Sequence, residues 1–110
     1  MAYRAGASSR RAFPRVPTEI RVHITRPDHS PLELIPATLQ DISQNGAMVI
    51  TTKTIPLGEW IALRPDHRGP AFGEELTAIV DRVIPAEGNA VKLACRFPEP
   101  LDYAVLRNFM

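Results

Sequence analysis

ATLQDISQNGAMVITT, residues 37–52, is the stretch that decides the fold. Its two ends are rich in apolar and β-branched residues, which favour β-strands. Between them, the polar hexapeptide Asp41–Gly46 ends in Asn45-Gly46, a pair typical of tight hairpins because both residues tolerate positive φ. We therefore expect residues 37–41 to form one strand, which turns at the hexapeptide, and residues 46–52 to return as its partner.

The clearest single strand precedes this hairpin. Residues 19–25, EIRVHIT, alternate strictly between polar and apolar side chains. In a strand this alternation sends Ile20, Val22 and Ile24 to a core, and Arg21 and His23 outward.

Three further strands follow the hairpin, over residues 60–63, 75–84 and 90–97. The chain has eleven prolines, mostly in the connections, and turn signals separate the apolar runs. Six short strands without a long helical period predict an all-β fold, either a small antiparallel barrel or a sandwich. The apolar spacing of residues 101–107 predicts a C-terminal helix packed on it, and the same apolar face could instead mediate self-association.

Length and composition bound the class of protein. A chain of 110 residues has room for one domain with a single core. No apolar run approaches the roughly 20 residues of a membrane span, and the N-terminus lacks the apolar stretch of a signal peptide, so we expect a cytoplasmic protein without a membrane span. The single cysteine, Cys95, agrees with a reducing compartment and is expected to be a buried structural thiol.

Charge is distributed unevenly along the chain. Residues 1–26 carry six arginines against Glu19 alone, a net +5, whereas residues 27–110 carry seven basic and eleven acidic side chains, a net −4. Arginine can grip a phosphate or the Hoogsteen edge of guanine with two parallel hydrogen bonds, which lysine cannot. The N-terminal segment therefore indicates an anionic partner, unless it is a solvated tail that only keeps the protein soluble.

The hexapeptide and the arginine segment together form a two-part pattern. Asp41, Ser43 and Gly46 have the spacing D-x-S-x-x-G, and Arg11 and Arg15 lie four residues apart ahead of the first strand. Alone, the hexapeptide is as well explained by an ordinary turn, which uses the same residue types. In this order, the two parts resemble the signature of the PilZ domain, a family that binds cyclic di-GMP. The resemblance covers the chain from about residue 10 to the C-terminus and implies a six-stranded antiparallel β-barrel of PilZ type.

The resemblance also implies a role for each motif residue. Arg11 and Arg15 would bind phosphate oxygens and the guanine O6/N7 edge. Asp41 would accept hydrogen bonds from guanine N1 and N2, and Ser43 would hydrogen-bond a base or phosphate. Gly46 would be required because a side chain there would strain the turn or fill the space of the ligand.

The N-terminal segment divides into two parts in this interpretation. Residues 1–9 form a flexible arm, and residues 10–110 form the PilZ domain. Arg10 stands immediately before the motif, where in the family a basic residue accompanies binding of a mutually intercalated ligand dimer, so we expect two ligands per protomer. Ligand binding would order the arginine segment against the barrel and create a surface for a downstream protein partner.

Two functions other than cyclic di-GMP binding also fit the sequence, and two further kinds of site do not. A PilZ-type adaptor that works by protein contact with weak or no ligand binding, and a small basic β-barrel that binds nucleic acid, both remain open, the second being less favoured. The sequence shows neither a nucleophile–base pair nor a phosphate-binding glycine loop, so we do not expect an enzyme. The repeated Arg-Pro-Asp-His at residues 26–29 and 64–67 lacks further ligands at metal-site spacing, so we expect no metal and no cofactor besides the ligand. Trp60 could stack on a base, or belong to the core or seal a barrel end.

Overall fold

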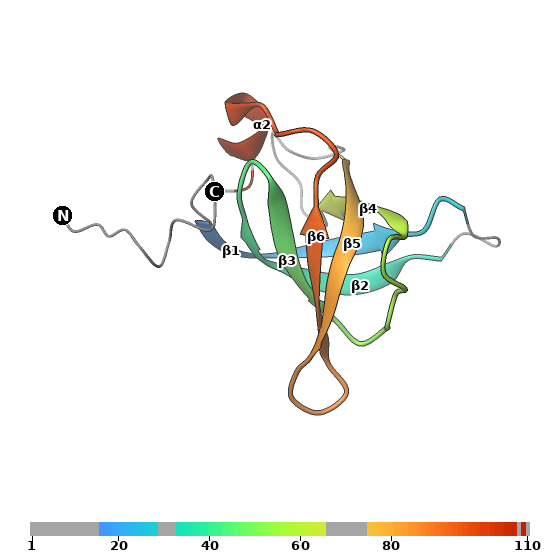
Figure 1. The fold of residues 1–110 in the computed structure, drawn as a ribbon. Coiled ribbons are helices and arrows are strands. Elements are labelled where there is room, and N and C mark those ends of the chain that lie inside the picture. The colour runs from blue at the N-terminus through green and yellow to red at the C-terminus, as the bar shows by residue number, and fades with distance from the viewer. Residues whose placement is uncertain (1–15, 29–32, 66–74, 108, 110) are drawn as a thin grey trace, which may run out of the picture.

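The computed structural model describes residues 16–28, 33–65, 75–107 and 109. Six antiparallel strands close into a barrel, and a short helix follows them (Figure 1). The elements are β1 Val16–Thr25, β2 Ile35–Ile42, β3 Gly46–Thr51, β4 Trp60–Pro65, β5 Leu76–Pro85, β6 Val91–Arg96 and α2 Tyr103–Arg107. The predicted all-β class, the barrel and the C-terminal helix are thus confirmed, while the predicted flexible arm lies outside the described residues.

The strands follow the order β1-β2-β3-β6-β5-β4 around the barrel, and β1 pairs with β4 to close it. Four of the pairs join strands that follow each other in the sequence: β1–β2, β2–β3, β4–β5 and β5–β6. The pairing of β3 with β6 joins parts of the chain some 50 residues apart, so the segment between β3 and β4 must cross one end of the barrel. Ile55, in that segment, is completely buried, so it helps to fill this end.

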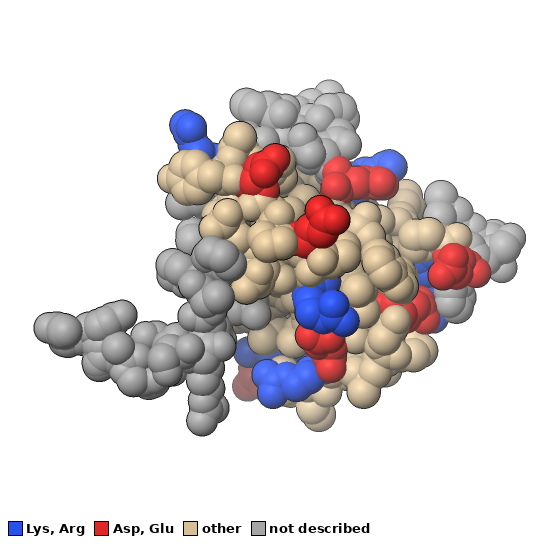
Figure 2. Space-filling model, turned by 45° about the horizontal axis from the view of Figure 1, so that its top comes forward, with Lys and Arg blue, Asp and Glu red and all other residues tan. Residues whose placement is uncertain are grey.

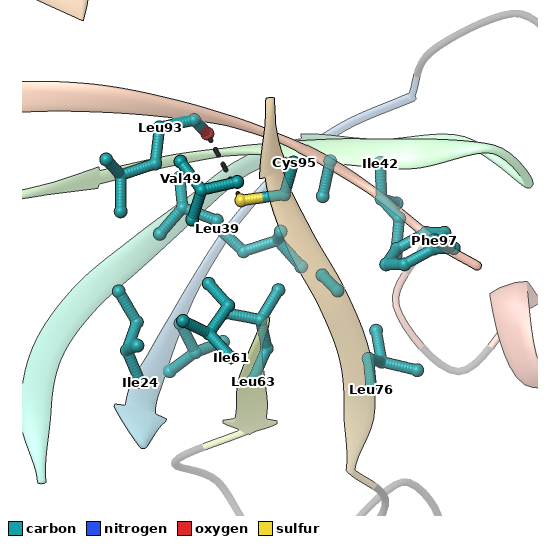
Figure 3. Packing of buried hydrophobic residues seen from close by; sticks show 14 of the residues in the cluster. Ile24, Leu39, Ile42, Val49, Ile61, Leu63, Leu76, Leu93, Cys95 and Phe97 are labelled. Atoms are coloured by element: carbon teal, nitrogen blue, oxygen red, sulfur yellow. Dashed lines mark hydrogen bonds between the residues drawn. The ribbon is translucent and has the colours of Figure 1, made fainter. Parts of the chain in front are cut away.

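The core consists of the inward side chains of all six strands. Figure 3 shows Ile24, Leu39, Val49, Leu63 and Leu93 converging in the barrel interior. Cys95 lies among them, 3% exposed, with its thiol 3.6 Å from the carbonyl oxygen of Leu93. The expected buried thiol is therefore confirmed. Each described strand pairs with two neighbours, although β1 pairs with β4 only over its last four residues, Val22–Thr25.

The C-terminal segment covers the barrel end at which β2 turns into β3. In Figure 1, α2 stands beside that turn. Phe97, Leu106 and Phe109 are 5%, 7% and 1% exposed and belong to the same hydrophobic cluster as the strands. The predicted helix therefore packs on the barrel, although it begins at Tyr103 and not at residue 101.

The structure corrects one local expectation and adds detail to two others. The strict alternation of residues 19–25 is preceded by a bulge, where the β1–β2 register shifts between Pro17 and Ile20 and Glu19 adopts φ 52°. Neither Asn45 nor Gly46 has positive φ, contrary to the expected hairpin, and the residues between β2 and β3 are Ser43, Gln44 and Asn45. Trp60 is not a core residue: 46% of it is exposed on the outside of β4.

Candidate functional site

The turn between β2 and β3 is shaped by the side chain and backbone of Ser43. The amide of Ser43 donates to the carbonyl of Gly46 at 2.8 Å. The hydroxyl oxygen accepts from the amides of Asn45 and Gly46, at 3.2 and 3.3 Å, and lies 3.4 Å from the Gly46 carbonyl oxygen. Ser43 is 3% exposed, so its hydroxyl satisfies buried backbone groups of the turn.

Gly46 is required by a close approach between two strands. It begins β3 and lies opposite Arg96 on β6. A Cβ atom at this position would lie 2.2 Å from the carbonyl oxygen of Cys95, a backbone atom that cannot move without shifting β6. The spacing of β3 and β6 is therefore one reason for a glycine here, whereas Gly46 lacks the positive φ of a strained turn. Space for the ligand, the other expected reason, stays a prediction.

Asp41 presents a carboxylate on the outside of the barrel next to this turn. It is half-buried on β2 and lies opposite Met48 on β3, whose chain neighbours Ala47 and Val49 both point into the core. Since side chains alternate along a strand and paired residues share a face, Met48 and Asp41 point outward. On its other side Asp41 lies opposite Pro17 of β1.

The arginines Arg10, Arg11 and Arg15 lie outside the described residues. The point from which they extend is described, because Val16 begins β1 and lies opposite Ile42. Arg15 is bonded to Val16, and Ile42 is bonded to Ser43. The β1–β2 register therefore brings Val16, the residue that follows the arginine motif, opposite Ile42, the residue that precedes Ser43, on adjacent strands about 4.8 Å apart.

Sequence reasoning missed the attachment of the turn to the C-terminal segment. The amide of Phe97 donates to the carbonyl of Asn45, and the amide of Leu101 donates to the carbonyl of Gln44, both at 2.8 Å. The side-chain amide of Gln44 donates in return to the carbonyl of Leu101 at 2.8 Å. No local pattern around Gln44 signals a partner 57 residues away.

One ion pair of the described residues lies next to the turn, and a more buried one lies at the far end of β1. Figure 2 shows acidic side chains spread over the end of the barrel that carries α2, with basic and acidic groups close together below them. Arg96, beside Gly46 in the β3–β6 register, forms an exposed ion pair with Asp81 at 3.3 Å. Arg26 and Glu59 form a more buried pair at the far end of β1, and the hydrogen bonds that Arg26 donates to the Glu59 carboxylate raise the pKa of Arg26 above its ordinary value.

A metal site finds no support in the part of the chain that the structure describes. No group of three or more His, Cys, Asp or Glu side chains there is arranged to hold an ion. His29 and His67 of the repeated tetrapeptides lie outside the described residues. No described helix has the length and apolar character needed to cross a membrane.

The fold is similar to two solved structures. One is the inhibitor of motility (MotI/DgrA) of Bacillus subtilis, with a TM-score of 0.63 and 18% identity over 91% of this chain and 49% of that one. The other is the PilZ domain of YcgR from Escherichia coli, solved with cyclic di-GMP, with a TM-score of 0.60 and 16% identity over 91% of this chain and 86% of that one. The chain thus spans about half the length of the Bacillus protein.

No curated protein matches the chain closely enough to report. The model of the PilZ domain family matches residues 9–110, nearly the whole sequence. This match agrees with the closed six-stranded barrel and with both structural neighbours. The chain belongs to the PilZ domain family.

Proposed function

We propose that this chain is a receptor for cyclic di-GMP, which binds between the arginine segment and the turn after β2. The observation that carries the proposal is the β1–β2 register, since Val16 lies opposite Ile42 and Pro17 opposite Asp41. Arg15 and Asp41 are 26 residues apart in the sequence, and this register supports the proposal that the two halves of the motif meet at one end of one strand pair. The family match and the cyclic di-GMP complex of the YcgR domain support the choice of ligand.

Each charged group has a complementary part of the ligand. Arg11 and Arg15 supply planar guanidinium groups for the phosphates and for guanine O6 and N7. Asp41 accepts from guanine N1 and N2, which are donors that arginine cannot read. Because Asp41 is half-buried on a strand of a closed barrel, its carboxylate is held in place before the ligand arrives.

Ser43 and Gly46 contribute in a different way. The buried Ser43 hydroxyl bonds the turn itself, so we propose that it fixes the backbone that the ligand contacts, in addition to the ligand hydrogen bond expected from the motif. Gly46 lets β3 approach β6 closely and so sets the position of the turn.

Arg10 would bind a second ligand molecule. Its guanidinium can stack on or pair with a purine of an intercalated dimer, giving two ligands per protomer. Holding the arginine segment in one conformation costs about 1–2 kcal/mol per residue in backbone entropy, and the ligand contacts would offset this. The segment ordered in this way would form part of the surface that a downstream protein recognises.

Isothermal titration with cyclic di-GMP tests the proposal. Arg15→Ala and Asp41→Ala should each weaken binding by about tenfold or more, since each removes a charge-assisted hydrogen bond. Arg64→Ala and Asp28→Ala, which change charge outside both motifs, are matched controls and should bind as the unmodified chain does. Saturation at one ligand per chain would refute the dimer.

The same titration separates the rival functions. A protein-contact adaptor would give no heat with cyclic di-GMP. A nucleic-acid binder would instead bind oligonucleotides with a steep salt dependence and would be indifferent to Asp41→Ala.

A further inference from the structure

Arg96 stands next to the proposed site on a strand that belongs to neither motif. It is the last residue of β6, and its chain neighbours Cys95 and Phe97 are buried in the core. Alternation along the strand therefore directs Arg96 outward, and 53% of its side chain is exposed. Across the β3–β6 pair it lies opposite Gly46, the final residue of the D-x-S-x-x-G motif.

Two uncharged residues, Met48 and Ala94, lie between Asp41 and Arg96 on the outer face of the described sheet. Asp41, Met48 and Ala94 lie in line across β2, β3 and β6, and Arg96 follows Ala94 by two residues on the same face. Strand spacing and residue rise place the Cα atoms of Asp41 and Arg96 about 12 Å apart. This separation suits two ends of one dinucleotide-sized ligand lying across β3.

The present partner of Arg96 holds it weakly. Its Nε lies 3.3 Å from Oδ1 of Asp81, whose side chain is 48% exposed. Exposed pairs of this kind change an equilibrium constant by less than about fivefold, because water competes for both groups. An anion with several oxygens in a defined position would be a stronger partner.

Asp81 has its position because β5 is irregular. The β5–β6 register shifts between Val80 and Arg82, so Asp81 is an extra residue opposite β6. Backbone hydrogen bonds fix the bulge, from the amide of Gly58 to the carbonyl of Val80 at 2.7 Å and from the amide of Val80 to the carbonyl of Glu59 at 3.0 Å. The fold of β5 therefore holds the Asp81 carboxylate beside Arg96.

We propose that Arg96 is a further ligand-binding residue of the cyclic di-GMP site and that it exchanges Asp81 for a phosphate or guanine edge of the ligand. The proposal rests on the proposed function and adds a third contact surface, β6, to the two motifs. Asp81 then competes with the ligand: it occupies the guanidinium in the free protein and lowers the apparent affinity.

Titration of cyclic di-GMP into Arg96→Ala, Arg96→Lys and Asp81→Asn tests this exchange. Arg96→Ala should weaken binding by about 10- to 100-fold, the loss of a charged hydrogen-bond partner. The affinity of Arg96→Lys should lie between that of Arg96→Ala and that of the unmodified chain, since an ammonium keeps the charge without the planar fork. Asp81→Asn should strengthen binding by up to about fivefold, because the competing carboxylate is gone. A purely structural ion pair would not make the Asp81 variant bind more tightly.

The chain offers a matched control pair. Arg64 and Glu75 form an ion pair at 2.9 Å with side chains 52% and 43% exposed, but between β4 and the start of β5. Arg64→Ala and Glu75→Gln should leave affinity unchanged. Unchanged affinity in Arg96→Ala, with an unchanged melting temperature, would overturn this inference alone. Absence of any binding by the unmodified chain would overturn the proposed function together with it.

Discussion

Gln44 and Leu101 are joined by two reciprocal hydrogen bonds. The Leu101 amide donates to the Gln44 carbonyl, and the Gln44 side-chain amide donates to the Leu101 carbonyl, each at 2.8 Å. The first contact is a backbone interaction that survives substitution, whereas the second depends on the side chain. This pair fastens the motif turn to the segment that leads into α2.

Gln44→Ala should therefore loosen the C-terminal segment without unfolding the barrel. Loss of one partly buried hydrogen bond should lower the free energy of unfolding by about 0.5–1.5 kcal/mol, measured by urea denaturation. Amide exchange at Leu101 and in α2 should accelerate, while exchange in β5 should not change. Asn45→Ala is the control, because the contact of Asn45 with Phe97 uses its backbone carbonyl. Equal exchange rates in the two variants would contradict the assigned role.

Gly46→Ala should disturb the pairing of β3 with β6. A methyl group 2.2 Å from the Cys95 carbonyl oxygen forces the strands apart, and overpacking of this kind costs about 1–3 kcal/mol or more. Amide shifts along β3 and β6 should move in a nuclear magnetic resonance spectrum.

Gly88→Ala provides the contrast for this substitution. Gly88 has φ 61° and nothing within 4 Å of an added Cβ, so its cost is local backbone strain of about 1–2 kcal/mol. The amide shift changes caused by Gly88→Ala should be confined to the β5–β6 turn. Shifts of Gly46→Ala that remained within residues 43–46 would show that the close approach is relieved locally.

The ion pair of Arg26 and Glu59 should contribute more stability than the exposed pairs. Arg26 donates from Nε and Nη2 to the two carboxylate oxygens, at 2.5 and 2.9 Å, and the side chains are only 12% and 14% exposed. Glu59→Gln should lower the free energy of unfolding by about 1.5–3 kcal/mol, the range for hydrogen bonds to charged groups. The equivalent Glu75→Gln change, in an exposed pair, should cost about 0–1 kcal/mol. Equal losses would rule out a special contribution from burial.

The raised pKa of Arg26 fixes the sign of its pH dependence. A cationic group whose pKa is raised by folding stabilises the native state fully below its ordinary pKa, and that stabilisation is lost only as the pH rises through the raised value. The contribution of the Arg26 guanidinium should therefore be constant across the neutral range. A urea series between pH 6 and pH 9 on the unmodified chain and on Arg26→Gln should give a constant difference, and a difference that falls toward pH 9 would contradict it.

Removal of residues 1–9 should leave cyclic di-GMP affinity unchanged, whereas removal of residues 1–15 should abolish it. The first deletion removes Arg4 and keeps the three arginines of the motif, and the second removes those as well. Isothermal titration of both truncated chains checks this division. Loss of binding in the shorter deletion would place part of the site within residues 1–9.

The regular parts of the fold follow from local patterns. Alternation of polar and apolar residues located β1, and apolar or β-branched runs between turn signals located the other five strands. The ends are displaced by up to three residues, as for β1, which begins at Val16 and not at Glu19. The burial of Cys95 followed from its apolar surroundings. These features depend on the period of the side chains along one strand, which a single segment of sequence contains.

The parts that sequence did not reveal depend on partners distant along the chain. Gly46 is explained by the carbonyl of Cys95, and Gln44 by Leu101, in both cases about 50 residues away or more. The positive φ of Glu19 arises in a bulge, where register with β2 outweighs the local preference of a non-glycine residue. At the motif itself, residue types and spacing identified the turn, but only the β1–β2 register shows that Val16, which follows the arginine motif, lies opposite Ile42, which precedes Ser43.

The attachment of the turn on two sides bears on how binding could be detected. Val16 begins β1 beside the turn, and Phe97 and Leu101 fasten the opposite end of the chain to the same four residues. A pair of fluorescent labels, one attached near Val16 and one near Leu101, would therefore both lie beside the turn. Energy transfer between them would give a direct optical sensor of the second messenger, built without inserting anything into the barrel.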